Sequence, residues 1–175
     1  GVVWTEDELR TVAEICYEEK VLVFSDEIHA DLTLPPYKHR PFATISEKAK
    51  MNSVTFMSPS KAFNMPGLAA SHAIIFNEDL RARFRKFMDA GELDMGHVFA
   101  FLSVEAAYTH GTEWLDQCLA YIQGNIDYVD NFLKTHVFFC PRTLLNSSHI
   151  HRIQEHAYNY FHQAYILCDY STICD

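Results

Sequence analysis

Two short polar stretches, each near the end of an apolar run, hold the residues best suited to chemistry. The stretch SPSKAFNMPG, residues 58–67, follows the run SVTFM and places Lys61 directly after two serines, and Asp26 lies just after the run VLVF. A lysine amine attacks a carbonyl when partial desolvation favours its uncharged form, and serine hydroxyls with loop amides can bind a phosphate. A lysine for an aldehyde, an acid for a pyridine nitrogen and donors for a phosphate are the parts of a pyridoxal phosphate site.

The apolar runs predict the elements that must position these residues. Continuous β-branched and aromatic runs at residues 21–24, 53–57 and 72–76 are typical of strands that are buried on both faces of a parallel sheet. In an open α/β sheet the carboxyl ends of the strands form the ligand crevice, so Asp26 and Lys61 can face one small molecule there. The sequence therefore predicts an α/β fold with a mainly parallel sheet flanked by helices.

Helix signals occur between and after the predicted strands. Thr5 and Glu8 form a capping box in front of an apolar stripe, which predicts the start of a helix. Asn77 is placed to cap another helix, whose apolar residues keep helical spacing. A proline-containing polar segment predicts an irregular loop. Helices are expected at residues 6–20, from residue 78, at residues 98–108 and at residues 111–135, and the loop at residues 31–49.

Composition limits the classes of partner and compartment. The chain has 175 residues, which fits one domain, and its formal net charge of −9 argues against a nucleic-acid partner because it repels phosphate backbones. No apolar run approaches the roughly 20 residues of a membrane helix, so no membrane span is expected. The five cysteines form no CxxC pair and predict neither a disulfide framework nor a metal site. A reducing cytoplasm is the expected location.

Four segments together resemble the fold type I pyridoxal-phosphate enzymes. Within that group the chain is most similar to the cystathionine β-lyase-like, or cysteine-S-conjugate β-lyase, branch of the class I/II aminotransferase family. The combination of SPSKAFN with SDEIH makes the resemblance highly specific. The segments are VFSDEIHADL (23–32), KHRPFATISE (38–47), NSVTFMSPSKAFNMPGLAASHAIIFN (52–77) and VEAAYTHGTEWLDQCLAYIQGN (104–125).

The resemblance implies roles for five residues. Lys61 would bind the aldehyde of pyridoxal 5'-phosphate covalently and later move the Cα proton of the substrate. Asp26 would pair with the pyridine nitrogen, and His29 stands near the position of the phenolic oxygen. Ser58 and Ser60 would contact the phosphate. Family members are typically homodimers with shared active sites, so a homodimeric parent is also implied.

The resemblance also implies an activity, with alternatives. It implies α,β-elimination on a small amino-acid substrate, cystathionine or another cysteine S-conjugate, with release of a thiol, pyruvate and ammonia. Transamination stays open, because the sequence lacks the segments that would face the substrate. A third hypothesis, from another class, is a truncated and catalytically inert fragment.

The sequence departs from the family pattern in three ways. Ala69 stands where many aminotransferases place an arginine on the phosphate. A phosphate loop expected before Gly1 and a small C-terminal domain have no counterpart, so a fragment is expected. Residues 1–136 are interpreted as part of the cofactor-binding large domain, with the start of a connector to the small domain. Residues 137–175 are rich in His, Tyr and Cys in no recognisable zinc spacing, and they are interpreted as an unassigned, aberrant tail.

Overall fold

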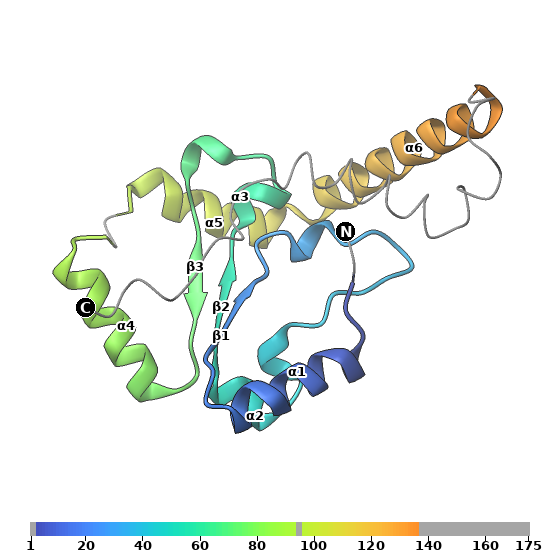
Figure 1. Ribbon diagram of the computed structural model, residues 1–175. Helices are drawn as coiled ribbons and strands as arrows, with labels where there is room; N and C mark the ends of the chain where they lie inside the picture. Colours follow the sequence, from blue (N-terminus) through green and yellow to red (C-terminus); the bar gives the residue numbers. More distant parts are fainter. Residues whose placement is uncertain (1–2, 94–95, 137–175) are drawn as a thin grey trace. The chain divides into compact units, whose positions relative to one another are not determined.

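A computed structural model describes residues 3–93 and 96–136 of the chain (Figure 1). The chain divides into two parts, residues 3–123 and residues 1–2 with 124–175. The strands are β1 (Val23–Asp26), β2 (Ser53–Met57) and β3 (His72–Ile74). The α-helices are α1 (Glu6–Glu18), α2 (Glu47–Met51), α3 (Pro59–Ala62), α4 (Glu78–Ala90), α5 (Val98–His110) and α6 (Thr112–His136), and the 3-10 helices are η1 (Ala30–Leu32), η2 (Phe42–Thr44) and η3 (Pro66–Leu68).

The three strands form one sheet in the order β1-β2-β3, which confirms the predicted α/β class. Strands β1 and β2 are parallel, with Asp26 opposite Phe56, whereas β2 and β3 are antiparallel, with Met57 opposite His72. A parallel connection needs a crossover that carries the chain back along the sheet. Residues 58–71 form only the short helices α3 and η3, so the chain enters β3 at the edge where β2 ends.

Burial differs between the strands. In β2, Val54 is completely buried and its neighbours Ser53 and Thr55 are also buried, as predicted. In β1 and β3 the prediction of burial on both faces is wrong, because Phe24 is 47% exposed and Ile74 is 37% exposed. Within the described ranges, β1 and β3 each pair with β2 alone, so a continuous apolar run did not distinguish them from a central strand.

Apolar side chains cover the sheet from both sides. On one side, buried residues of α1, η2 and α2 form a core cluster that also contacts Val23 of β1. On the other side, the rings of Phe24 and Phe56 stack at 6.0 Å, and Phe84 of α4 lies 6.4 Å from Phe56. Helix α4 therefore reaches the sheet through an aromatic contact. The buried members of the core cluster are Ala13, Phe42, Ile45 and Ala49.

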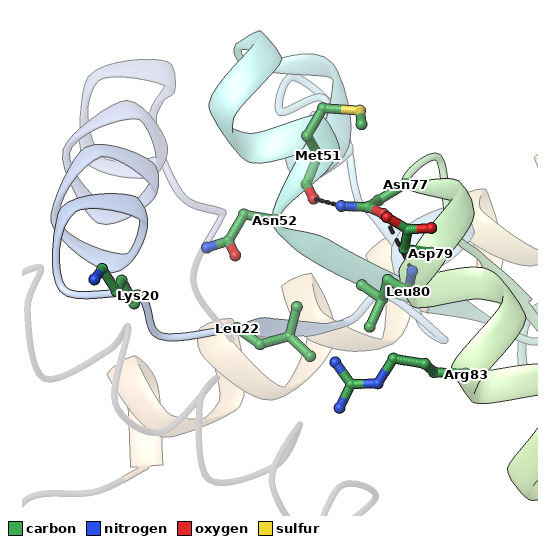
Figure 2. A pocket seen from close by; sticks show the side chains of 8 residues that line it. All are labelled: Lys20, Leu22, Met51, Asn52, Asn77, Asp79, Leu80 and Arg83. Atoms are coloured by element: carbon green, nitrogen blue, oxygen red, sulfur yellow. Dashed lines mark hydrogen bonds between the residues drawn. The ribbon is translucent and has the colours of Figure 1, made fainter.

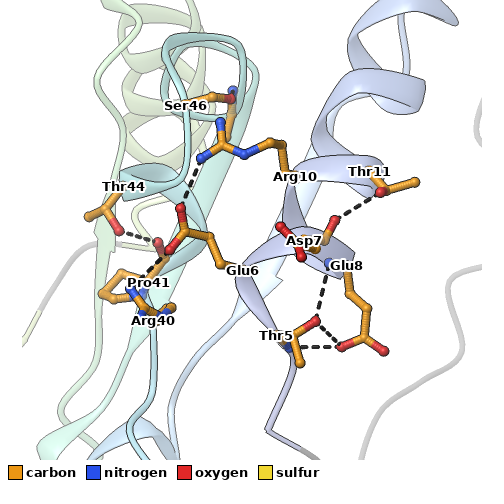
Figure 3. Close-up of polar contacts among 11 residues, drawn as sticks. Thr5, Glu6, Asp7, Glu8, Arg10, Thr11, Arg40, Pro41, Thr44 and Ser46 are labelled. Atoms are coloured by element: carbon orange, nitrogen blue, oxygen red, sulfur yellow. Dashed lines mark hydrogen bonds and ion pairs between the residues drawn. The ribbon is translucent and has the colours of Figure 1, made fainter.

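Helix α1 begins at the predicted capping box (Figure 3). The Glu8 amide donates to Thr5 Oγ1 at 3.3 Å, and the Thr5 amide donates to Glu8 Oε2 at 2.7 Å. The carboxylate of Glu6 forms ion pairs with Arg10 at 2.9 Å and with Arg40 at 3.1 Å. The second pair ties the segment after residue 38 to α1.

The prediction of an irregular loop at residues 31–49 is wrong in part, because this segment overlaps η1, contains η2 and includes the start of α2. Helix α2 begins where Ser46 Oγ accepts a hydrogen bond from the Ala49 amide at 3.1 Å. A serine cap followed by Glu47 is a recognisable helix start, which the prolines earlier in the segment obscured.

The predicted helices after β3 are confirmed as α4, α5 and α6. The side chain of Asn77 accepts from the Leu80 amide at 3.1 Å and caps α4. Gly111 separates α5 from α6, and a Cβ there would lie 2.5 Å from the Ala107 carbonyl oxygen and 2.5 Å from a ring carbon of Phe63. Only glycine fits this contact. In the described part of the chain, no helix combines the length and apolar character needed to span a membrane.

Candidate functional site

The carboxyl ends of β1 and β2 place the predicted site residues at one edge of the sheet. Because these strands are parallel and in register, Asp26 at the end of β1 lies level with Phe56, close to the point where β2 leads into Ser58. Lys61 follows within α3, and Figure 1 shows α3 at this end of β2. The structure thus brings the ends of both predicted motifs to the same edge, as the sequence predicted.

Helix α3 presents Lys61 on its outer side. Ser58 is extended and Pro59 occupies the first turn, a position that suits proline because its missing amide would have no helical partner. Pro59 and Ala62 are buried, whereas the side chain of Lys61 is exposed. These neighbours of Lys61 therefore turn inward, and the lysine itself stays at the surface.

Ser58 and Ser60 form a buried hydroxyl pair. Their Oγ atoms lie 2.7 Å apart, and the carbonyl oxygen of Ala70 accepts from Ser58 at 2.6 Å and from Ser60 at 3.3 Å. Both serines and Ala70 are buried. Both hydroxyls thus donate to an internal acceptor, and Ser58 could donate a hydrogen bond to a phosphate only if its bond to Ala70 opened.

Asp26 directly precedes the turn that leaves β1, and His29 lies within that turn. Asp26 is exposed, and its Oδ1 accepts a hydrogen bond from the Ile28 amide at 3.3 Å, which orients the carboxylate at the strand end. His29 is half-buried and directly precedes η1. Because η1 packs against α3, this turn lies beside the helix that carries Lys61.

A cluster behind the lysine helix was not predicted from the sequence. Burial raises the pKa of Asp31, and the neighbouring His39 and His72 oppose that rise. Burial also raises the pKa of Tyr108, with a smaller contribution from the charge of Asp31. The ring of His72 meets that of Tyr108 nearly edge-on at 6.2 Å. No sequence spacing links these residues, because they come from η1, the segment before η2, β3 and α5. Both η1 and α5 pack against α3.

The chemical groups at this edge of the sheet are of the kinds that pyridoxal phosphate requires. An exposed primary amine, an exposed carboxylate and two hydroxyls are the groups that would meet its aldehyde, pyridine nitrogen and phosphate. No set of three metal-ligating side chains occurs within residues 3–93 and 96–136. The histidines and cysteines of the segment 137–175 lie outside the described residues.

A cavity of about 260 Å³ lies at the opposite edge of the sheet (Figure 2). Leu22 lines it just before β1 begins, and Asn52 lines it just before β2 begins. Asn77 also lines the cavity, and its Nδ2 donates a hydrogen bond to the Met51 carbonyl oxygen at 3.0 Å (Figure 2). The cavity therefore belongs to the amino ends of the parallel strands and contains none of the predicted site residues.

Comparison with known proteins identifies close relatives of this architecture. Cystathionine beta-lyase PatB of Bacillus subtilis is 42% identical over 135 residues, which cover 77% of this chain and 35% of the relative. An aspartate aminotransferase of the same species is 37% identical over 73 residues, which cover 42% of this chain and 19% of the relative. The solved structure of cystalysin from Treponema denticola, which contains a pyridoxal 5'-phosphate cofactor, superimposes with a TM-score of 0.72 at 36% identity, covering 77% of this chain and 35% of that one.

The match with a family model extends over most of the chain. The model of the aminotransferase class I and II family matches residues 1–143. The chain spans about a third of the length of the curated relatives it matches, with 35% of PatB covered. The fold, the sheet edge that carries Lys61 and these similarities agree, and the chain belongs to the aminotransferase class I and II family.

Proposed function

We propose that this chain is part of a pyridoxal-phosphate-dependent carbon–sulfur β-lyase that acts on cystathionine or another cysteine S-conjugate. The observation that carries the proposal is the delivery of Asp26 and Lys61 to one edge by the parallel strands β1 and β2. The similarity to cystathionine beta-lyase PatB favours the lyase over other reactions of the family. Residues 1–136 would form part of the cofactor-binding large domain, with the start of the connector.

Each residue at this edge would have a separate task. The amine of Lys61 would bind the aldehyde carbon and, once displaced by the substrate amine, would take the proton from the substrate Cα. The Asp26 carboxylate would hold a proton on the pyridine nitrogen, and His29 would lie near the phenolic oxygen. Ser58 and Ser60 would donate to the phosphate once their hydrogen bonds to the Ala70 carbonyl oxygen open. When bound, pyridoxal phosphate supplies an electron sink, which allows a thiolate to leave from Cβ.

Transamination is the second candidate, because an aspartate aminotransferase is also similar to part of this chain. Product analysis separates the two reactions. A free thiol with pyruvate and ammonia supports the lyase, whereas a keto acid with pyridoxamine phosphate supports the transferase. A homodimeric parent and a cytoplasmic location are further parts of the proposal, and the net charge of −9 gives no support for a nucleic-acid partner.

Borohydride trapping tests the proposal. The chain is incubated with pyridoxal phosphate, reduced and mapped by mass spectrometry, with Lys61→Arg and Lys38→Arg as paired variants. Lys38 is a suitable control because it is also an exposed lysine and is not part of α3. Labelling at Lys61 that survives Lys38→Arg and disappears in Lys61→Arg is the expected result. Scattered labelling, or none, would contradict the proposal for this chain and favour an inert fragment.

A further inference from the structure

Glu27 follows Asp26 in the sequence, but its side chain points into the protein. Successive side chains of an extended strand alternate between its two faces, so the residue after an exposed aspartate at the end of β1 faces inward. Glu27 is 6% exposed, which is rare for a glutamate unless it is well paired. Its burial needs an explanation that the roles proposed for Asp26 and Lys61 do not give.

The carboxylate of Glu27 is held by three partners. Its Oε1 accepts from Ser25 Oγ at 2.8 Å and from the Phe42 amide at 2.9 Å, and its Oε2 lies 2.6 Å from His39 Nε2. Burial raises the pKa of Glu27, but the hydrogen bonds from His39, Phe42 and Ser25 lower it more, so that pKa lies below its ordinary value. The buried carboxylate is therefore charged and anchored at neutral pH.

Glu27 opens the turn that links two predicted cofactor contacts, Asp26 and His29. Its amide donates to the Phe56 carbonyl oxygen at 2.9 Å, and its own carbonyl oxygen accepts from the Ala30 amide at 2.9 Å. Asp26 precedes this turn and His29 lies inside it. The side chain of Glu27 thus fixes the turn to the segment at residues 39–42, and the Arg40–Glu6 ion pair fixes that segment to α1 (Figure 3).

We propose that Glu27, paired with His39, is a positioning residue that sets the placement of Asp26 and His29 for the cofactor. The inference rests on the proposed function, because that function supplies the ligand that Asp26 and His29 would meet. Truncation of Glu27 would leave the buried Phe42 amide without its acceptor and would release the turn. Asp26 would then sample several orientations at the strand end, and the cofactor would bind more weakly.

The test compares full-length chains with Glu27→Ala, Glu27→Gln and, as a matched control, Asn77→Ala. Asn77 caps α4 and bridges to Met51 at the opposite edge of the sheet, so its loss lowers stability without touching the turn. The first readout is the dissociation constant for pyridoxal phosphate, measured by equilibrium dialysis. The second is hydrogen exchange of the amides at residues 26–32 in the cofactor-free chain.

The expected results separate positioning from general stability. Glu27→Ala should weaken cofactor binding about tenfold and accelerate exchange at residues 26–32, because a hydrogen-bonded buried charge is lost. Glu27→Gln keeps an oxygen for Ser25 and Phe42 and should restore most of both values. Asn77→Ala should leave both unchanged. Equal cofactor binding and equal exchange in Glu27→Ala and the unsubstituted chain would overturn the inference.

Two further outcomes remain interpretable. If Glu27→Ala does not fold, His39→Ala replaces it, since this variant removes only the partly exposed partner. His39→Ala should weaken cofactor binding about threefold, and unchanged binding and exchange there would count against the pair. If the unsubstituted chain binds no pyridoxal phosphate, the proposed function falls, whereas binding that is unaffected by either substitution refutes only the positioning role.

Discussion

The buried serine pair after β2 allows a quantitative test of how the two hydroxyls stabilise the chain through their shared acceptor. Ser58 and Ser60 share one acceptor, the carbonyl oxygen of Ala70, at 2.6 Å and 3.3 Å. In Ser58→Ala the hydroxyl of Ser60 can still reach Ala70, and in Ser60→Ala the shorter bond from Ser58 is untouched. Each single substitution should therefore lower the free energy of unfolding by about 1 kcal/mol, the usual net value of one hydrogen bond.

The double substitution should lower the free energy of unfolding by more than the sum of the single ones. It removes both donors and leaves the carbonyl of Ala70, a residue only 6% exposed, without a hydrogen bond from Ser58 or Ser60. An unsatisfied buried polar group costs about 1–3 kcal/mol. The total loss in Ser58→Ala/Ser60→Ala should then be about 3–4 kcal/mol, with a coupling energy of about 1–2 kcal/mol beyond additivity.

Urea unfolding of the cofactor-free chain, followed by far-UV circular dichroism, measures these values. The control combines Ser58→Ala with Ser46→Ala, because Ser46 caps α2 and shares no acceptor with Ser58. That pair should be additive within about 0.5 kcal/mol. If Ser58→Ala and Ser60→Ala were equally additive, the shared carbonyl would not depend on the two hydroxyls, and the reasoning would be refuted.

Three other predictions follow from single contacts. Thr5→Ala removes the side-chain acceptor of the α1 capping box and should lower the free energy of unfolding by about 1 kcal/mol, measured by urea unfolding. Because the folded-state pKa of Glu27 lies below its ordinary 4.5, its contribution to stability is complete above that pH and is lost as pH falls through the folded-state pKa. Glutamine does not titrate, so in Glu27→Gln the free energy of unfolding should fall less steeply as the pH drops below 4.5. An equally steep fall in both chains would contradict the role given to Glu27. Gly111→Ala places a Cβ against the Ala107 carbonyl oxygen and the ring of Phe63. This overpacking should lower the free energy of unfolding by about 1–3 kcal/mol, which a lower melting temperature would show.

Local signals predicted the starts of α1 and α4, whereas the long-range geometry of the sheet was predicted less well. The caps at Thr5 and Asn77 were predicted because each needs only a few consecutive residues. The direction of β3 was missed because it depends on how far residues 58–71 carry the chain, and an apolar run contains no such information. The same limit explains Phe24, which was predicted to be buried and is half exposed.

At the candidate site, too, some features could be predicted from the sequence and others depended on long-range packing. The common edge of Asp26 and Lys61 could be predicted because parallel strands put their carboxyl ends together. The outward direction of Lys61 could not be predicted, since it depends on which side of the short helix α3 packs inward. The neighbourhood of Asp31 and Tyr108 depends on the packing of α5, and no motif in the sequence records it.

The aromatic contacts of Phe63 give the chain an internal optical probe. Phe63 ends α3, and its ring lies 6.1 Å from that of Trp114 at the start of α6. The sequence holds only two tryptophans, so in a Trp4→Phe chain the tryptophan emission would come from Trp114 alone. Its fluorescence would then report any displacement of the lysine-bearing helix, and the arrival of a ligand at Lys61 could be followed in real time without an attached label.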